Sequence, residues 1–235
     1  MKKQSVFYMI PFYILTVVGI IFIGSYADKT VMTMAQNSEV PQYHTVIIDP
    51  GHGGVDGGAT SCSGVLESKF NLDISLRLRD IMNLLGIRTV MIRTTDESVY
   101  TEGNTISAKK LSDLKERVRI VNQTSNGILI SIHQNYFTDS RYSGAQVFYA
   151  DTQGSKQLAE TIQKSLTQTL NPDNQRACKK AEHIYLLQHI TSPGILVECG
   201  FLSNYQEETL LRNETYQKAL SSVIAATVNL YLYDT

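Results

Sequence analysis

Two short apolar runs on either side of one amphipathic pattern constrain the fold of this chain most strongly. The runs are 45-TVIID-49 and 88-RTVMIR-93, and both are rich in the β-branched residues that favour buried strands. Between them, apolar residues recur every three or four positions over 67–86, which is the pattern of a helix with one buried face. Gly86 then provides a helix stop. A strand, a helix and a strand in this order predict an α/β fold.

The alternation continues to the end of the chain. The further elements that we expect are strands at 127–132, 145–150, 184–187 and 194–198, and helices at 112–121, 155–170 and 216–230. The connection between 127–132 and 145–150 is too short for a helix, so we expect these two strands to be antiparallel neighbours. We expect the polar segment 94–110 to be a long loop. The sequence therefore predicts one α/β domain, with a mostly parallel, mixed sheet of about six strands and helices on both faces.

The first 27 residues differ in kind from the rest. Two lysines precede an uncharged apolar run over 6–26, and about 20 apolar residues are enough to span a bilayer. We expect 1–27 to be a membrane anchor or signal segment, and the small-x-small sequence that ends at Ala27 leaves cleavage open. Residues 28–44 lack a sustained period and predict a tether. The rest of the chain, the domain 45–235, is then expected outside the cytoplasmic membrane.

Charge and cysteine content disfavour several classes of protein. The chain has 21 Lys and Arg against 22 Asp and Glu, a net charge of −1, so we expect no nucleic-acid partner. Three cysteines, Cys62, Cys178 and Cys199, form no CxxC pair. Neither a disulfide framework nor a cysteine-rich zinc module is therefore expected.

The glycine-rich loop 49-DPGHGG-54 directly follows the first strand. It does not fit a dinucleotide-binding fingerprint, because Asp56 stands where the third glycine is needed, and no phosphate-loop lysine follows. We interpret it as a turn whose glycines let the backbone approach a site that contains His52. Asp49, at the end of the strand, is expected to orient the His52 imidazole.

Three more residues are expected at the same edge of the sheet. His133 directly follows the strand 127–132, Glu67 opens the helix 67–86, and Glu198 ends the strand 194–198. Two histidines and one carboxylate are a known catalytic zinc set, and a further carboxylate can move protons. Each residue alone also has an ordinary structural explanation, a hydrogen-bonded histidine or a solvated first-turn carboxylate. A Cys199–His133 nucleophilic pair is disfavoured because 199–204 resembles a buried turn.

The motifs in their order resemble those of the zinc-dependent N-acetylmuramoyl-L-alanine amidases of the third amidase type. The resemblance covers 45–233 and rests on 48-IDPGHGG-54, 67–96, 114–135 and 195-ILVECGFLSN-204. It implies that His52, Glu67 and His133 bind one zinc ion and that Glu198 is the general acid and base. Arg93, Arg117 and Asn135 also fall on family motif positions, and we expect them to support the ligands or to orient the substrate.

Within that family the likeness is greatest to the germination-specific amidases of the spore cortex. This implies hydrolysis of the amide between the lactyl group of N-acetylmuramic acid and L-alanine in peptidoglycan, before muramic-δ-lactam forms. It also implies action in the cortex or intermembrane space of a spore-forming bacterium. An accessory protein that supports zinc retention or activity is a candidate partner, as is the membrane through the N-terminal segment.

Two alternatives stay open on the sequence alone. The same ligands suit a zinc peptidoglycan carboxypeptidase or deacetylase, because they define the electrophile and not the substrate. A non-catalytic wall-binding module would not need Glu198. The other histidines, His44, His183 and His189, are expected to have no special role. The basic cluster 176-RACKK-180 is expected to be a solvated face that could meet substrate carboxylates.

Overall fold

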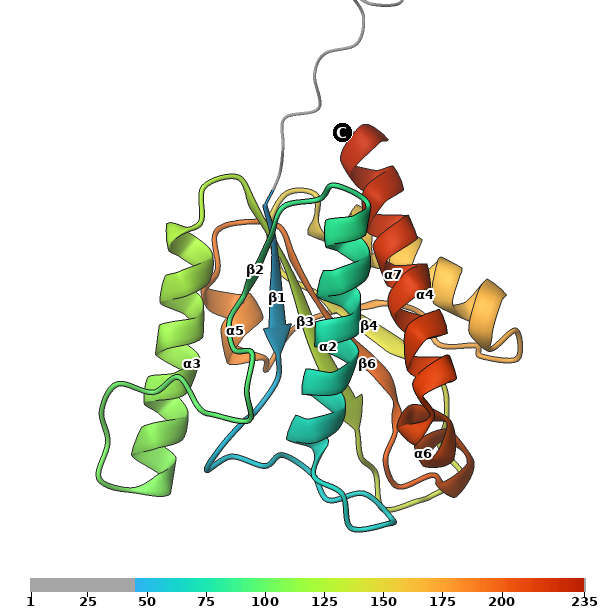
Figure 1. Ribbon diagram of the computed structural model, residues 1–235, viewed down its shortest axis with the longest axis horizontal. Helices are drawn as coiled ribbons and strands as arrows, with labels where there is room; N and C mark the ends of the chain where they lie inside the picture. The colour runs from blue at the N-terminus through green and yellow to red at the C-terminus, as the bar shows by residue number, and fades with distance from the viewer. Residues whose placement is uncertain (1–44, 235) are drawn as a thin grey trace, which may run out of the picture. The chain divides into compact units, whose positions relative to one another are not determined.

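A six-stranded sheet organises residues 45–234, which are the residues that this computed structural model describes (Figure 1). Its strands are β1 (Thr45–Pro50), β2 (Thr89–Met91), β3 (Gly127–Asn135), β4 (Gln146–Tyr149), β5 (Lys179–Lys180) and β6 (Gly194–Phe201). Their order across the sheet is β2-β1-β3-β6-β4-β5. All neighbouring pairs are parallel except β4 and β6. The predicted mixed, mostly parallel sheet is confirmed.

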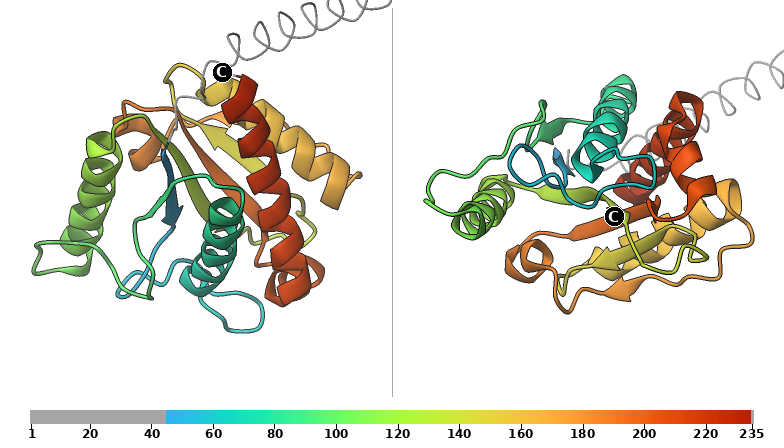
Figure 2. Two further views of the ribbon diagram at one scale, coloured as in Figure 1. Left: turned by 45° about the horizontal axis from the view of Figure 1, so that its top comes forward. Right: turned by 90° about the horizontal axis from the view of Figure 1, so that it is seen from below.

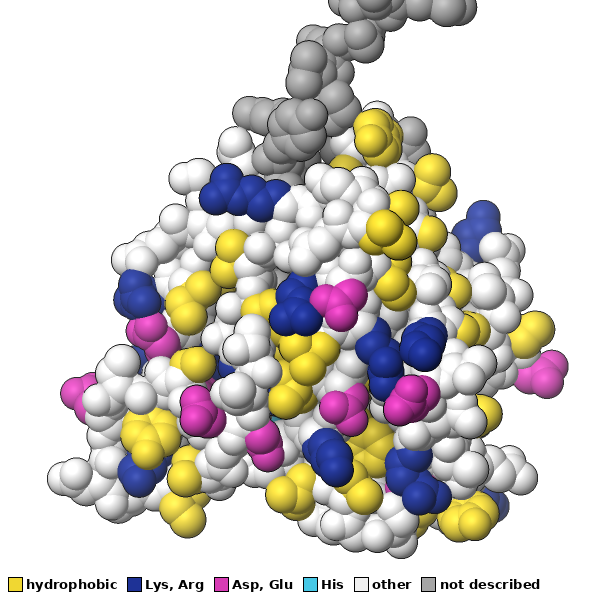
Figure 3. All heavy atoms as spheres, in the orientation of Figure 1, with side chains coloured by type: hydrophobic (Ala, Val, Ile, Leu, Met, Phe, Trp, Pro, Cys, Tyr) yellow, Lys and Arg dark blue, Asp and Glu magenta, His cyan; other side chains and the backbone are white. Residues whose placement is uncertain are grey.

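Helices cover both faces of this sheet, as predicted. They are α2 (Glu67–Leu84), α3 (Ile106–Gln123), α4 (Ser155–Leu170), α5 (Tyr185–His189), α6 (Tyr205–Arg212) and α7 (Glu214–Asp234). The helices α2, α4 and α7 pack on one face, and α3 and α5 pack on the other (Figure 2). Over α2 and α7 basic and acidic side chains are interspersed, without a field of a single sign (Figure 3).

The alternation of side chains along the strands decides which face carries the polar residues of interest. The apolar residues of the three central strands that face α3 and α5 include Ile47, Leu129 and Leu196. Since successive residues of a strand point to opposite faces, Asp49, His133 and Glu198 share that face. All three lie toward the carboxyl ends of their strands. The fold thus brings them to one edge of the sheet.

The expectation that the third and fourth strands of the chain are neighbours is wrong. The strand β6 lies between β3 and β4, pairing with β3 in parallel and with β4 antiparallel. A connection of ten residues is too short for a crossover helix, but an extended chain of that length easily passes over the end of one intervening strand. The apolar strand β6 is thereby buried at the centre of the sheet.

Residues 184–187, predicted as a strand, belong instead to the short helix α5, and the sheet ends on the two-residue strand β5. A run of four apolar residues does not distinguish a strand from a buried helical turn. The strand β5 consists of two exposed lysines, and charge on a short edge strand hinders pairing with other chains.

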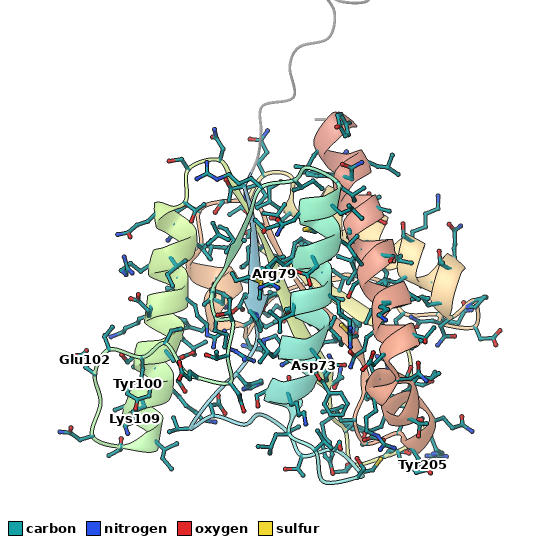
Figure 4. The ribbon with its side chains drawn as sticks, in the orientation of Figure 1. Asp73, Arg79, Tyr100, Glu102, Lys109 and Tyr205 are labelled. Atoms are coloured by element: carbon teal, nitrogen blue, oxygen red, sulfur yellow. The ribbon has the colours of Figure 1, made fainter. Side chains whose placement is uncertain are left out.

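The helix α3 begins before the predicted residue 112. Thr105 is its N-cap and accepts a hydrogen bond from the Ala108 N–H. Ser112 and Asp113, which suggested a later start, accept N–H groups of the preceding loop instead. In this region Lys109 lies 5.0 Å from the centroid of the Tyr100 ring (Figure 4).

The closing helix predicted at 216–230 lies within α7, and the short helix α6 precedes it. Asn204 caps α6 and Asn213 caps α7, each accepting two backbone N–H groups at the start of its helix. The anchor predicted at 1–27 and the tether at 28–44 lie outside the described residues. Within 45–234, none of the helices is both long and apolar enough for a membrane span.

Candidate metal centre

His52, Glu67 and His133 converge beyond the carboxyl ends of β1 and β3. One potential ligand atom from each lies within 4.8 Å of the other two. The Glu67 carboxylate stands between the rings, with Oε2 3.2 Å from His52 Nε2 and Oε1 3.1 Å from His133 Nδ1. The three residues predicted as zinc ligands are therefore neighbours in the fold.

Two glycines make room for this convergence. A side chain at Gly51 would overlap the His133 ring. At Gly58, where φ is +70°, a Cβ atom would lie 2.6 Å from Glu67 Oε2 and 2.8 Å from the His52 ring. Both positions therefore need glycine if the imidazoles and the carboxylate are to meet.

Glu67 is the first residue of α2, and its carboxylate is almost fully enclosed. It accepts hydrogen bonds from the Ala59 and Gln134 N–H groups and from Asn71 Nδ2. Its position at a helix N-terminus also favours the anion. These contacts fix both carboxylate oxygens toward the two histidines.

Arg93 and Arg117 hold the backbone of the histidine loop. Arg93 donates to the carbonyls of Pro50 and Gly51, at 2.9 Å each. Arg117 reaches the loop from α3 and donates to the carbonyls of Pro50 and His52. Both guanidinium groups are buried, and their hydrogen bonds to these carbonyls fix the conformation of the loop. Asn135 ends β3, where its carbonyl accepts the Leu202 N–H.

Asp49 does not contact the His52 ring, which corrects our expectation. Its carboxylate accepts hydrogen bonds from Arg117 and from the Ser131 hydroxyl, because it faces α3. The carboxylate that contacts Nδ1 of this ring is that of Asp56, whose Oδ2 lies 3.0 Å away. Lys110 of α3 lies 2.7 Å from the other Asp56 oxygen. One signal for this role is present in the sequence, since Asp56 follows His52 by four residues in the same loop.

The two carboxylates next to His52, those of Asp56 and Glu67, determine the pKa of its ring. Burial alone would lower the pKa of His52, but the hydrogen bonds that Asp56 and Glu67 accept from its ring outweigh burial and raise the pKa to about 9. Burial would likewise raise the pKa of Glu67, yet the two histidines hold it well below its ordinary value. Glu67 is therefore an ionised carboxylate between two imidazoles, which suits a divalent cation.

Glu198 lies on β6 directly opposite His133. Its Oε2 atom is inaccessible to solvent and has no hydrogen-bond partner among the described residues. Burial raises the pKa of this carboxyl to about 7. A buried carboxyl oxygen without a partner is costly, and such groups are concentrated at sites where they transfer protons.

The site opens into a cavity of about 260 Å³ on the α3 and α5 side of the sheet. His52 and His133 form part of its wall, and Lys110 and Tyr185 lie across from the sheet. His183, for which we expected no role, also lines this cavity. No pattern near His183 in the sequence indicates this, because the segment before α5 is brought here by the fold.

The arrangement fits a zinc ion on its own chemistry. Two imidazole nitrogens and one carboxylate are available within a few ångströms, and the carboxylate is ionised. The Asp56 contact to the far nitrogen of His52 is the kind that orients metal-binding histidines. The unpartnered Glu198 oxygen is a proton acceptor close by.

Comparison with known proteins gives one family for this chain. A family model described as N-acetylmuramoyl-L-alanine amidase matches residues 46–229. The germination-specific N-acetylmuramoyl-L-alanine amidase of Bacillus subtilis (strain 168) is 38% identical over 181 residues, which are 76% of each protein.

Solved structures agree with that result. The CwlD amidase from Clostridioides difficile, in complex with the GerS lipoprotein, is 39% identical, with a TM-score of 0.78, over 82% of this chain and 100% of that one. An N-acetylmuramoyl-L-alanine amidase from Clostridium difficile 630 is 32% identical, with a TM-score of 0.70, over 80% of this chain and 96% of that one.

Proposed function

The chain belongs to the N-acetylmuramoyl-L-alanine amidase family, and from this premise we propose that it acts on spore cortex peptidoglycan. The bond hydrolysed is the amide that joins the lactyl group of N-acetylmuramic acid to L-alanine. Family membership favours this reaction over the carboxypeptidase, deacetylase and wall-binding alternatives. The germination-specific relative, of which this chain covers about three quarters, supports the cortex as the place of action.

His52, Glu67 and His133 hold one zinc ion in this proposal. The support is their convergence around an ionised carboxylate and the two glycines that make room for it. A bound zinc ion supplies a Lewis acid that polarises the scissile carbonyl and lowers the pKa of a water molecule. Arg93 and Arg117 keep the loop of His52 in shape.

Glu198 transfers the protons. Its carboxylate takes a proton from the attacking water and returns it to the amine of L-alanine as the C–N bond breaks. The observation that carries this assignment is the buried, unpartnered Oε2 atom opposite His133. A pKa near neutrality, here about 7, suits a group that must both accept and donate.

The substitution Glu198→Gln tests this role. It keeps the shape of the side chain but removes the basic oxygen, so turnover should fall by roughly 10²- to 10⁴-fold while zinc stays bound. Activity on purified cortex peptidoglycan and zinc content by metal analysis are measured on the same preparation. Near-normal turnover in the variant would contradict the assignment.

Product analysis tests the reaction itself. Mass spectrometry of a cortex digest should detect stem peptides with a free N-terminal L-alanine, and a chelator should stop their release until zinc is restored. Release of D-alanine with intact muramoyl–L-alanine bonds would instead indicate a carboxypeptidase. The remaining glycan carries muramic acid with a free lactyl carboxyl group, which a later lactam-forming reaction requires.

The place of action and the partner complete the proposal. The segment 1–27 tethers or exports the catalytic domain 45–235, which acts between the membranes of the developing spore. A lipoprotein accompanies the similar Clostridioides difficile amidase in its structure, and this supports an accessory protein for the present chain as well. Zinc content measured with and without a candidate partner tests whether that protein supports zinc retention.

A further inference from the structure

Arg176 precedes the edge strand β5 and is fixed in place by the chain segment that leads into β4. Its Nε donates to the Ser143 carbonyl at 2.8 Å, and its Nη1 lies 3.3 Å from Gln146 Oε1. The guanidinium carbon lies 4.7 Å from the centroid of the Phe201 ring and 5.8 Å from that of Tyr142. Two hydrogen bonds and two ring contacts therefore define the position of this side chain.

The backbone around Arg176 is held equally firmly. Asn174 is buried, and its side chain donates to the Ala145 carbonyl and accepts the Arg176 N–H. Gln146 Nε2 donates to the Ala177 carbonyl. The segment before β5 is thus hydrogen-bonded along the start of β4, and Arg176 is not a freely moving surface side chain.

The charge of Arg176 has no carboxylate partner in the part of the chain that the structure describes. Arg176 takes part in none of the ion pairs found between residues 45 and 234. Glu207 is close enough to feel this charge, but it forms no ion pair with Arg176, and its two oxygens accept the Gly144 and Phe201 N–H groups. An arginine that is fixed by neutral groups and forms no direct ion pair is suited to bind an anion.

Arg176 also lies next to the row of residues that performs the chemistry. His133 pairs with Glu198, and Glu198 pairs with Gln146 on the next strand, so these three side chains share one face of the sheet. Arg176 precedes β5 and is not part of the strand pairing, but its side chain contacts Gln146 and so lies beside the end of this row. Together with Arg141, it lines a surface hollow of about 360 Å³.

The chemistry of the substrate indicates what this cation meets. Of the two parts joined by the scissile amide, the glycan is uncharged, whereas the stem peptide carries free carboxylates. We infer that Arg176 binds a carboxylate of the stem peptide and so directs the peptide across β4, while the glycan extends away from it. Lys179, exposed and without an ion pair among the described residues, adds a second positive charge on the same edge segment.

This inference rests on the proposed amidase function. A pair of substrates distinguishes failure of the inference from failure of the proposed function. One is a soluble glycan with stem tripeptides whose carboxylates are free, and the other is the same compound with all of them converted to carboxamides. Wild-type protein should release peptide from both, with a higher KM for the amidated form. If wild-type protein cleaves neither of them nor cortex peptidoglycan, the proposed function fails, whatever the role of Arg176.

Arg176→Ala is the decisive variant. Loss of one charge-assisted contact should raise KM for the free-carboxylate substrate roughly 10- to 100-fold with kcat almost unchanged. The same variant should leave KM for the amidated substrate unaltered. Arg176→Lys, which keeps the charge but not the two-pronged geometry, should fall between wild type and the alanine variant.

Arg141→Ala is the matched control. Arg141 lines the same hollow, but its side chain is 89% exposed and already paired with Asp139. Arg141→Ala should leave KM for both substrates unchanged. An equal effect of Arg176→Ala on both substrates would mean that Arg176 only supports the packing of Tyr142 and Phe201, and the inference would be overturned. An Arg176→Ala variant with unchanged KM for both substrates would overturn the inference as well.

Discussion

Asp49 and Arg117 form a buried ion pair directly below the loop that carries His52. Arg117 is also bonded to the Pro50 and His52 carbonyls, so this pair fixes the backbone from which the His52 ring projects. Burial alone would raise the pKa of Asp49, but Arg117 and the Ser131 hydroxyl outweigh it and hold the pKa below its ordinary value. The stability of the loop therefore depends on an ionised Asp49.

Asp49→Asn should be destabilising, because it removes one of the two carboxylates paired with the buried Arg117 and leaves only Asp113. We expect a loss of about 2–3 kcal/mol in the free energy of unfolding at pH 7, measured by urea denaturation. The folded-state pKa of Asp49 is depressed, so its stabilising contribution is complete above the unfolded-state pKa of ~4 and is lost as the pH falls through the lower folded-state value. The difference in the free energy of unfolding between wild type and variant should accordingly become smaller below pH ~4.

Asp139→Asn is the control for that substitution. Asp139 pairs with Arg141 at the surface, where solvent screens the interaction, so its loss should leave the free energy of unfolding nearly unchanged. Two outcomes would contradict the role given to Asp49. One is a similar loss of unfolding free energy in both variants, and the other is a difference between wild type and Asp49→Asn that becomes larger in acid.

The loop between β1 and α2 needs glycine at two positions for two different reasons. Gly51 lacks the space for a side chain, and Gly64 has a backbone conformation that favours glycine. Gly51 has the His133 ring where a Cβ atom would stand. Gly64 has φ of +86° and open space around it. The two positions therefore separate crowding of the site from strain of the backbone.

Gly51→Ala should disrupt the site and Gly64→Ala should not. The added methyl at Gly51 pushes the His133 ring away from Glu67, so we expect loss of zinc and of activity. At Gly64 the cost is backbone strain of about 1 kcal/mol, with zinc content and turnover retained. Metal analysis and denaturation of both variants check this. A Gly51→Ala protein that binds zinc normally would show that the ring position is not limited by this contact.

The elements that bear the candidate ligands could be predicted from sequence because their patterns are long. The strands β1 and β6 are continuous apolar runs, and the apolar stripe of α2 extends over five turns. The short elements α5 and β5 could not, since two to five residues carry no readable period. The start of α3 could not be predicted, because Ser112, a good capping residue, accepts N–H groups of the neighbouring loop instead.

At the scale of the whole molecule, topology explains why the site residues meet. Parallel strands present their carboxyl ends at one edge, so a residue that follows β1 and residues near the ends of β3 and β6 are brought together. The surroundings of the site could not be foreseen in this way. Lys110 and His183 reach it from elements far along the chain, and no local pattern states which polar side chain meets a distant loop.

Because the three candidate ligands belong to three separate elements, a bound metal ion should stabilise the whole domain. The loop after β1, the start of α2 and the end of β3 are all remote from one another in the unfolded chain, where no preformed site exists. Zinc at about 1,000 times its dissociation constant would add roughly 4 kcal/mol to the free energy of unfolding. In a domain of this size that corresponds to an increase in Tm of roughly 8–16 °C.

Differential scanning calorimetry before and after chelation, and after zinc is restored, measures this increase. The Tm should fall on chelation and recover with zinc, and a His133→Ala variant should lack the zinc-dependent part because only two ligands remain. Metal analysis of each sample ensures that the ion was in fact removed. An unchanged Tm in zinc-free wild-type protein would mean that the metal does not link β1, α2 and β3, and the three-residue assignment would have to be given up.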